Sequence, residues 1–222
     1  MNSEPGKFEY GINQLLMAKK FAQIDKIARE IRVSKKRFVN GKWALNRLYD
    51  GLTTIYATKS EPFETDALWK ERIELLKSWK QKFPESATAR IALADTYVGY
   101  GWFARGTGYL NTVSEENLRL LNERITLAEN ELFEARSLIE KCPQWYKEKL
   151  FLAMANGAPE AEFEALFDEA ISVEPNYFPY YSIKSENLKP KWGGSSKKWQ
   201  EFLNSIPDIL AQHNSDCNHP VK

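Results

Sequence analysis

Aromatic residues surround a single arginine in the stretch DTYVGYGWFARGTGY, residues 95–109. A guanidinium stays charged at physiological pH, so a buried one must stack on a ring or pair with a carboxylate. Two interpretations are open. Arg105 could lock a helix end by pairing with Asp95 or Glu85, or it could lie in a groove and bind an anionic group of a partner. The groove predicts the partner-binding residues Tyr97, Tyr100, Trp102, Arg105 and Tyr109, with Trp192 as a further candidate.

Catalytic chemistry has a weaker basis in the sequence. The two histidines, His213 and His219, lie in a polar C-terminal stretch, and no G-x-S-x-G motif is present to suggest an activated serine. The alternative to a scaffold is an enzyme that acts on a saccharide or peptide through an acidic pair, Asp95 with a glutamate, in the same cleft. That alternative predicts a carboxyl group with a raised pKa in a pocket. We assign no catalytic residue.

Metal and anion sites are not predicted either. The stretch HNSDCNH, residues 213–219, contains suitable ligand types, but so near the C-terminus an ordered site is not expected. Residues 193–197, GGSSK, lack the spacing of a phosphate-binding loop. Instead, Ser195 or Ser196 should cap a helix that contains Trp199. No metal and no cofactor are therefore expected.

Apolar residues recur with helical spacing along almost the whole chain. The clearest stripe is formed by Leu121, Ile125, Ala128, Leu132, Ala135 and Ile139. Thr112 and Glu115 have capping-box spacing before this helix, and a proline at position 143 ends it. The same pattern predicts helices over 15–31, 43–56, 68–83, 88–103, 144–156, 159–171 and 175–188. The predicted fold class is all-α.

Prolines mark an irregular repeat of helix pairs. Pro143 and Pro175 each precede an aromatic pair at a spacing close to the tetratricopeptide period, and Pro84 opens an earlier, similar unit. The aromatic segment lies in an insertion between these units. We predict tetratricopeptide-like antiparallel helix pairs that bury one continuous core.

Composition limits the function classes. The charged residues, 31 basic and 30 acidic, leave a net charge of +1, so no global field favours nucleic acid. The short basic run 35–37 is interpreted as solvated surface. No stretch is apolar enough to span a membrane, and no leader is visible at the start, which favours the cytoplasm. We expect one domain over 1–222, with a core at about 20–205 and flexible tails at 1–8 and 212–222.

Five landmarks in the chain occur in an order typical of one family. They are GKWALNRLYDGL at 41–52, WKQKFPESATARIALADTYVGYGWFARGTGY at 79–109, CPQWY at 142–146, EPNYFPYY at 174–181 and LKPKWGG at 188–194. Together they resemble a bacterial domain-of-unknown-function family, the one numbered 4034, over about residues 20–205. The resemblance implies a tetratricopeptide-type helical protein and supplies no catalytic residue to transfer.

The sequence thus favours a scaffold that binds a protein or peptide through the aromatic groove. A third possibility is a structural subunit that buries its aromatic surfaces by self-association.

Overall fold

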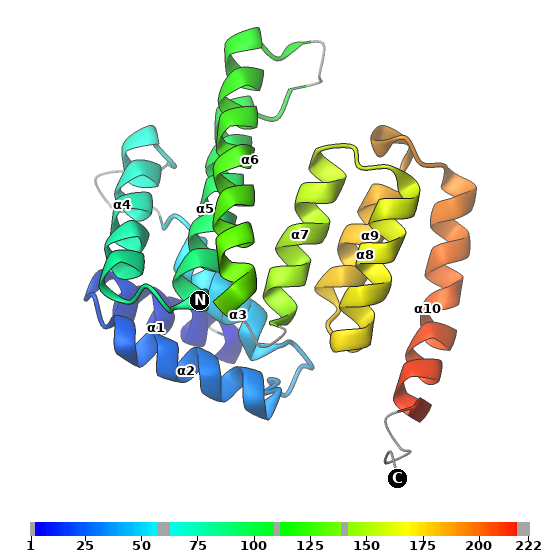
Figure 1. The fold of residues 1–222 in the computed structure, drawn as a ribbon, viewed down its shortest axis with the longest axis horizontal. Helices are drawn as coiled ribbons and strands as arrows, with labels where there is room; N and C mark the ends of the chain where they lie inside the picture. Colours follow the sequence, from blue (N-terminus) through cyan, green and yellow to red (C-terminus); the bar gives the residue numbers. More distant parts are fainter. Residues whose placement is uncertain (1–2, 57–62, 109–111, 139–141, 217–222) are drawn as a thin grey trace. The chain divides into compact units, whose positions relative to one another are not determined.

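The protein is all-helical, as the periodicity predicts. The computed structural model describes residues 3–56, 63–108, 112–138 and 142–216 (Figure 1). Ten α-helices and short 3-10 turns account for the regular structure of these residues. The only β-type pairing in the described part is an isolated bridge between Arg37 and Trp43. The prediction of an all-α fold is therefore confirmed, while the likeness to tetratricopeptide repeats remains a prediction.

The described chain divides into two compact units, where the sequence suggested one domain. The first covers Met1–Glu140 and the second Lys141–Lys222. The helices of the first unit are α1 (Glu4–Met17), α2 (Phe21–Ser34), α3 (Ala44–Thr53), α4 (Asp66–Lys82), α5 (Ala87–Arg105) and α6 (Glu115–Ala135). Those of the second are α7 (Pro143–Ala155), α8 (Glu160–Val173), α9 (Pro179–Asn187) and α10 (Ser196–Asp216).

The first helical pattern is split into two helices. Residues 15–31, expected as one helix, are interrupted after Met17, and Lys19 has a left-handed φ of 55°. Residues 4–8, expected in a flexible tail, form the first turns of α1, which Ser3 caps by accepting a hydrogen bond from the backbone N–H of Gly6. Likewise α10 continues past residue 212, into the other expected tail.

α1 crosses α3 at very close range. A Cβ atom at Gly51 would overlap the carbonyl oxygen of Glu9 and lie 2.9 Å from Ile12 Cβ. Only glycine leaves the space for this approach. The crossing places the polar edge of α1 against α3.

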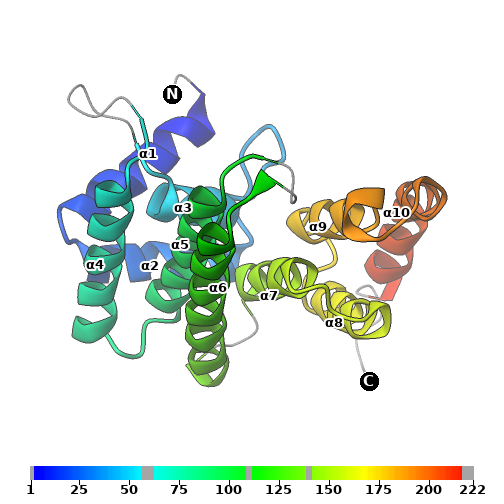
Figure 2. The same cartoon turned by 90° about the horizontal axis from the view of Figure 1, so that it is seen from above.

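α4, α5 and α6 lie side by side in both views of the first unit (Figures 1 and 2). Trp79 of α4 is fully buried, stacks on Phe21 of α2 at 5.4 Å between ring centroids, and donates a hydrogen bond to Asp25. Asp25 also accepts a hydrogen bond at 2.6 Å from Ser86, the residue that caps α5. This carboxylate therefore ties α2 to the α4–α5 turn.

The long stripe of α6 faces the core as predicted. Ile125, Ala128, Leu132 and Ala135 are all buried, whereas the last predicted member, Ile139, lies outside the described residues. The cap of this helix lies two residues later in the chain than predicted. Ser114, not Thr112, accepts the capping hydrogen bond, from the N–H of Asn117 at 3.1 Å.

In the second unit, proline opens two of the four helices. Pro143 and Pro179 occupy the first turns of α7 and α9, where a missing N–H costs nothing. Ser195 caps α10 by accepting from the N–H of Lys198 at 3.2 Å, as predicted. Phe167, Tyr181 and Phe202 pack edge to face and stacked, and so join α8, α9 and α10.

Candidate functional site

Two of the predicted groove residues are core residues. Tyr97 is 7% exposed and Tyr100 is 6% exposed, because both belong to the face of α5 that packs in the first unit. These two side chains therefore leave little surface for a partner. Their direct contact with a partner stays a prediction.

Tyr100 lies in a cluster of aromatic rings and charges contributed by three helices. Its ring stacks on Trp69 of α4 at 5.9 Å and on Phe103 at 6.4 Å between centroids. The guanidinium carbon of Arg124, from α6, lies 3.2 Å from the centroid of the same ring. Arg124 also donates a hydrogen bond to the carbonyl oxygen of Tyr100 at 2.5 Å. Through these contacts Tyr100 of α5 joins α4 to α6.

The electrostatics of this cluster follow from burial and hydrogen bonding. Burial, followed by the hydrogen bond to the Asp66 carboxylate, raises the pKa of Tyr100. Hydrogen bonds from Lys70 and then Tyr100 lower the pKa of Asp66. Asp66 therefore stays ionised, which is the opposite of what a general acid needs.

Arg124, not Arg105, is the arginine that the rings bury. Its side chain is 11% exposed and lies 3.9 Å from a carboxylate oxygen of Asp66. The chemistry expected of a buried guanidinium, a ring face and a carboxylate, is therefore present on α6. The sequence does not single out Arg124. It lies between Leu121 and Ile125, two members of an apolar stripe, and nothing local shows that its guanidinium reaches a ring on another helix.

Arg105 lies at the C-terminal end of α5 and remains half-buried. Its guanidinium carbon is 5.2 Å from the centroid of the Trp102 ring. The Nη1 group donates hydrogen bonds to the carbonyl oxygens of Gly106 and Gly108, both at 3.1 Å. Asp95 and Glu85, the carboxylates expected to pair with Arg105, are not among its hydrogen-bond partners in the described residues. Arg105 thus closes the helix end through backbone carbonyls, where a positive charge also complements the helix dipole.

The neighbouring glycines have different roles. Gly106 ends α5 with a φ of +74°, as expected for a helix terminus. Gly99 lies inside the helix, where a Cβ atom would come within 2.7 Å of the Trp69 ring. The glycine in this position therefore lets α4 approach α5.

The remaining predicted site residues do not extend the cluster. Tyr109 lies outside the described residues. Trp192 belongs to the second unit, where it ends a short 3-10 turn, Pro190–Trp192, and donates to Glu186 at 3.4 Å. Of the predicted residues, Trp102 and Arg105 are therefore the two partly exposed ones at the C-terminal end of α5, where the exposed Phe103, which was not predicted, lies between them in the sequence. We call these three residues the α5 end.

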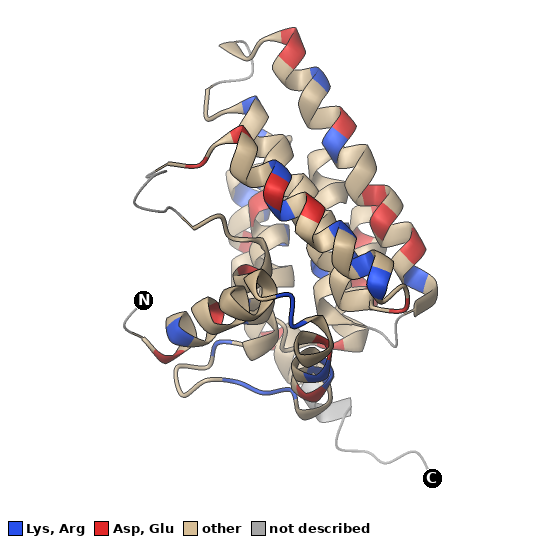
Figure 3. Ribbon diagram, turned by 90° about the vertical axis from the view of Figure 1, so that its left-hand side faces the viewer, with Lys and Arg blue, Asp and Glu red and all other residues tan. Residues whose placement is uncertain are grey.

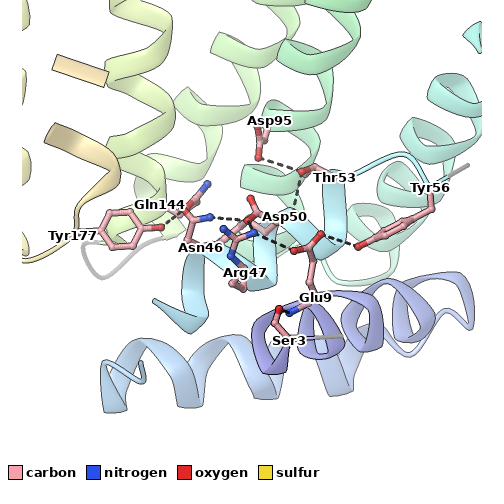
Figure 4. A network of polar contacts seen from close by, with 12 residues as sticks. Ser3, Glu9, Asn46, Arg47, Asp50, Thr53, Tyr56, Asp95, Gln144 and Tyr177 are labelled. Atoms are coloured by element: carbon pink, nitrogen blue, oxygen red, sulfur yellow. Dashed lines mark hydrogen bonds and ion pairs between the residues drawn. The ribbon is translucent and has the colours of Figure 1, made fainter. Parts of the chain in front are cut away.

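A separate polar network joins α1, α3 and α5 (Figure 4). Glu9 accepts hydrogen bonds from Arg47 at 3.2 Å and from the Tyr56 hydroxyl at 3.0 Å. Arg47 also pairs with Asp50 at 2.9 Å, and Thr53 donates to Asp95 at 3.4 Å. These contacts join α1 to α3 and α3 to α5.

The network also changes the pKa of Tyr56, which donates a hydrogen bond to Glu9. Burial, followed by the hydrogen bond to Glu9, raises the pKa of Tyr56 well above its ordinary value. Tyr56 therefore remains a neutral donor to Glu9 at physiological pH. The arrangement ties α1 to α3 through a charge-assisted hydrogen bond, and the enzyme alternative based on Asp95 remains a prediction.

Comparisons with protein families, with curated proteins and with solved structures gave no match. The resemblance to the family numbered 4034 therefore stays a prediction. Among the described residues, no group of three or more His, Cys, Asp or Glu side chains is arranged to hold a metal ion. In the stretch 213–219, two residues of suitable ligand type, Cys217 and His219, lie outside the described residues. No described helix combines the length and apolar character that a membrane span requires.

Proposed function

We propose that the protein is an interaction scaffold that binds a protein or peptide partner through the α5 end. The observation that carries the proposal is the packing of the Arg105 guanidinium over the Trp102 ring at the C-terminal end of α5, the same end of the helix at which Phe103 is 37% exposed. Trp and Arg are the residue types most enriched among residues that dominate binding energy. An aromatic surface with a fixed charge is suited to recognition.

The rigidity of the α5 end supports this role. Phe103 is held from behind by Tyr100 and by Trp69, whose centroid lies 6.1 Å away. Arg105 is held by two backbone carbonyls and by the face of Trp102. Because these side chains are already ordered, they lose little further conformational entropy when a partner binds.

The chemistry of Arg105 indicates the partner's contact group. Nη1 bonds the backbone, and in the described residues the Nη2 and Nε groups make no hydrogen bond. A guanidinium edge of this kind pairs with a carboxylate by two parallel hydrogen bonds. The partner should therefore present a carboxylate next to an apolar group that covers Phe103.

A capture experiment from the native host tests the proposal. Tagged wild-type protein is compared with the double variant Trp102→Ala/Arg105→Ala and with Phe133→Ala. Phe133 is a matched control because it lies on α6 of the same unit and is 77% exposed. The proposal predicts that the double variant loses specific partners that the wild type and the control retain.

A conservative change separates charge from geometry. Arg105→Lys keeps the positive charge but lacks the planar fork and stacks poorly on Trp102. It should therefore weaken capture nearly as much as Arg105→Ala. Identical partners and amounts for the wild type and the double variant would contradict the proposed function.

A further inference from the structure

A second recessed surface lies in the first unit, on α1 and the second half of α2. This cleft has a volume of about 680 Å³. Its apolar lining residues are Phe8, Ile27, Ile31 and Val33, and its polar ones are Arg29, Glu30, Ser34 and Lys36. The Glu30 carboxylate lies 3.9 Å from the Lys26 ammonium, and Val33 is 81% exposed. The α1–α2 cleft is therefore an apolar hollow whose lining holds two basic residues and one acidic residue that already faces a lysine.

The loop that follows α2 is firmly structured. Phe38 N–H donates to the carbonyl oxygen of Lys42 at 2.9 Å, and Ala44 N–H donates to that of Lys36 at 3.0 Å. Gly41 completes the turn with a φ of +78°. The buried ring of Phe38 meets Phe8 edge to face at 5.6 Å, so the loop is anchored to the wall of the cleft. Of the basic residues of this loop, Lys36 lines the hollow, whereas Arg37 packs over the Trp43 ring.

Charge is concentrated here, although the whole chain is close to neutral. Residues 26–42 contain seven basic residues and one acidic residue, whereas the full chain has a net charge of +1. Lys and Arg lie on both arms of the loop between α2 and α3 (Figure 3). At the tip, Val39 is fully exposed. The surface is therefore complementary to a partner that is both acidic and apolar.

We propose that the α1–α2 cleft binds an acidic peptide segment that carries one or two large apolar side chains. The apolar side chains enter the hollow beside Phe8, Ile27 and Val33, and the carboxylates pair with Lys36, Lys42 and Arg29. This surface is separate from the α5 end and binds independently of it. A peptide fits better than a flat anionic membrane because the apolar residues line a recess, and a helix or strand can enter a recess.

Fluorescence anisotropy with labelled peptides tests this proposal on the full chain. The probe is a short peptide rich in Glu and Asp with Leu and Phe at helical spacing. One control peptide replaces the acidic residues by Lys, and another replaces Leu and Phe by Ala. Only the first peptide should bind, and added salt should weaken its binding because exposed ion pairs are screened.

Charge-reversal variants locate the binding surface. Lys36→Glu/Lys42→Glu should weaken binding about tenfold, since each exposed ion pair contributes up to about 1 kcal/mol. The matched control is Lys19→Glu/Lys20→Glu, which makes the same charge change at exposed positions of the same unit. It should leave binding nearly unchanged. Val33→Asp, at an exposed position that tolerates substitution, should also abolish binding of the apolar peptide.

Several outcomes would overturn the proposal. They are equal binding of the acidic and the basic peptide, or equal losses in the two charge-reversal variants. Tighter binding to phosphatidylcholine–phosphatidylserine vesicles, with loss of that binding in Lys36→Glu/Lys42→Glu, would assign the surface to a membrane instead. Concentration-dependent dimers abolished by the same variant would assign it to a second copy of the chain. Unchanged peptide binding by Trp102→Ala/Arg105→Ala would confirm that the two surfaces are independent.

Discussion

The loss of stability caused by Tyr100→Ala tests whether Tyr100 is packed in the core. The side chain is 6% exposed, its ring contacts Trp69 and Phe103, and Arg124 lies over its face. Replacing a buried aromatic residue by alanine costs about 3–5 kcal/mol, because packing is lost and a cavity remains. Tyr100→Ala should therefore lower the free energy of unfolding by about that amount, a large share of the total of about 5–15 kcal/mol for a small protein.

The hydroxyl group contributes much less than the ring. Tyr100→Phe removes only the hydrogen bond to Asp66, whose side chain is 54% exposed. A hydrogen bond of this kind contributes about 0.5–1.5 kcal/mol, and the exposure of Asp66 favours the lower end. Urea unfolding followed by circular dichroism measures both variants against the wild type. A loss below about 1 kcal/mol for Tyr100→Ala would refute the packing described for this ring.

The remaining predictions concern a close helix crossing and an acid-sensitive ion pair. Gly51→Ala should destabilise the protein by about 1–3 kcal/mol, since the new methyl group overlaps the carbonyl oxygen of Glu9. Gly11→Ala, where the added atom meets nothing within 4 Å, should stabilise α1 by about 0.5–1 kcal/mol in the same urea assay. Hydrogen bonds from Lys189 and Lys191 lower the pKa of Glu186 from 4.5 to about 2. Because the folded state keeps this carboxyl ionised, its contribution to stability is complete above about pH 4.5 and is lost as the pH falls toward 2. Glu186→Gln should reduce stability at neutral pH and flatten the decline in that window, and an unchanged acid profile would contradict the pairing.

The periodic features of the fold could be predicted from the sequence. The stripe from Leu121 to Ala135 repeats every three or four residues, and from Ile125 onward its members form the buried face of α6. Pro143 marks the start of α7 for a local reason, the missing N–H, whereas α9 begins at Pro179 and not at Pro175, where the sequence pattern predicts its start. The interruption at Lys19 was missed, because no glycine or proline marks it and the apolar spacing continues across it.

The contacts of the candidate site could not be predicted in the same way. Whether Tyr100 faces the core depends on the register of α5 against α4 and α6, which no local spacing encodes. For the same reason the sequence pointed to Arg105, and not to Arg124, as the guanidinium buried among the rings. Arg124 reaches the Tyr100 ring from a different helix. Similarly, no local pattern brings Lys36, part of the basic run at 35–37, next to Phe8, and only the fold places both residues in the lining of one cleft.

The α5 end can be tested most directly by site-specific photo-crosslinking. A photoreactive phenylalanine analogue is placed at Phe103, and in a second protein at the exposed Phe133, and each is irradiated with the captured partner. If the α5 end is the contact surface, the partner crosslinks efficiently through position 103 and weakly through position 133. Equal crosslinking at the two positions, or crosslinking through position 133 alone, would contradict the account.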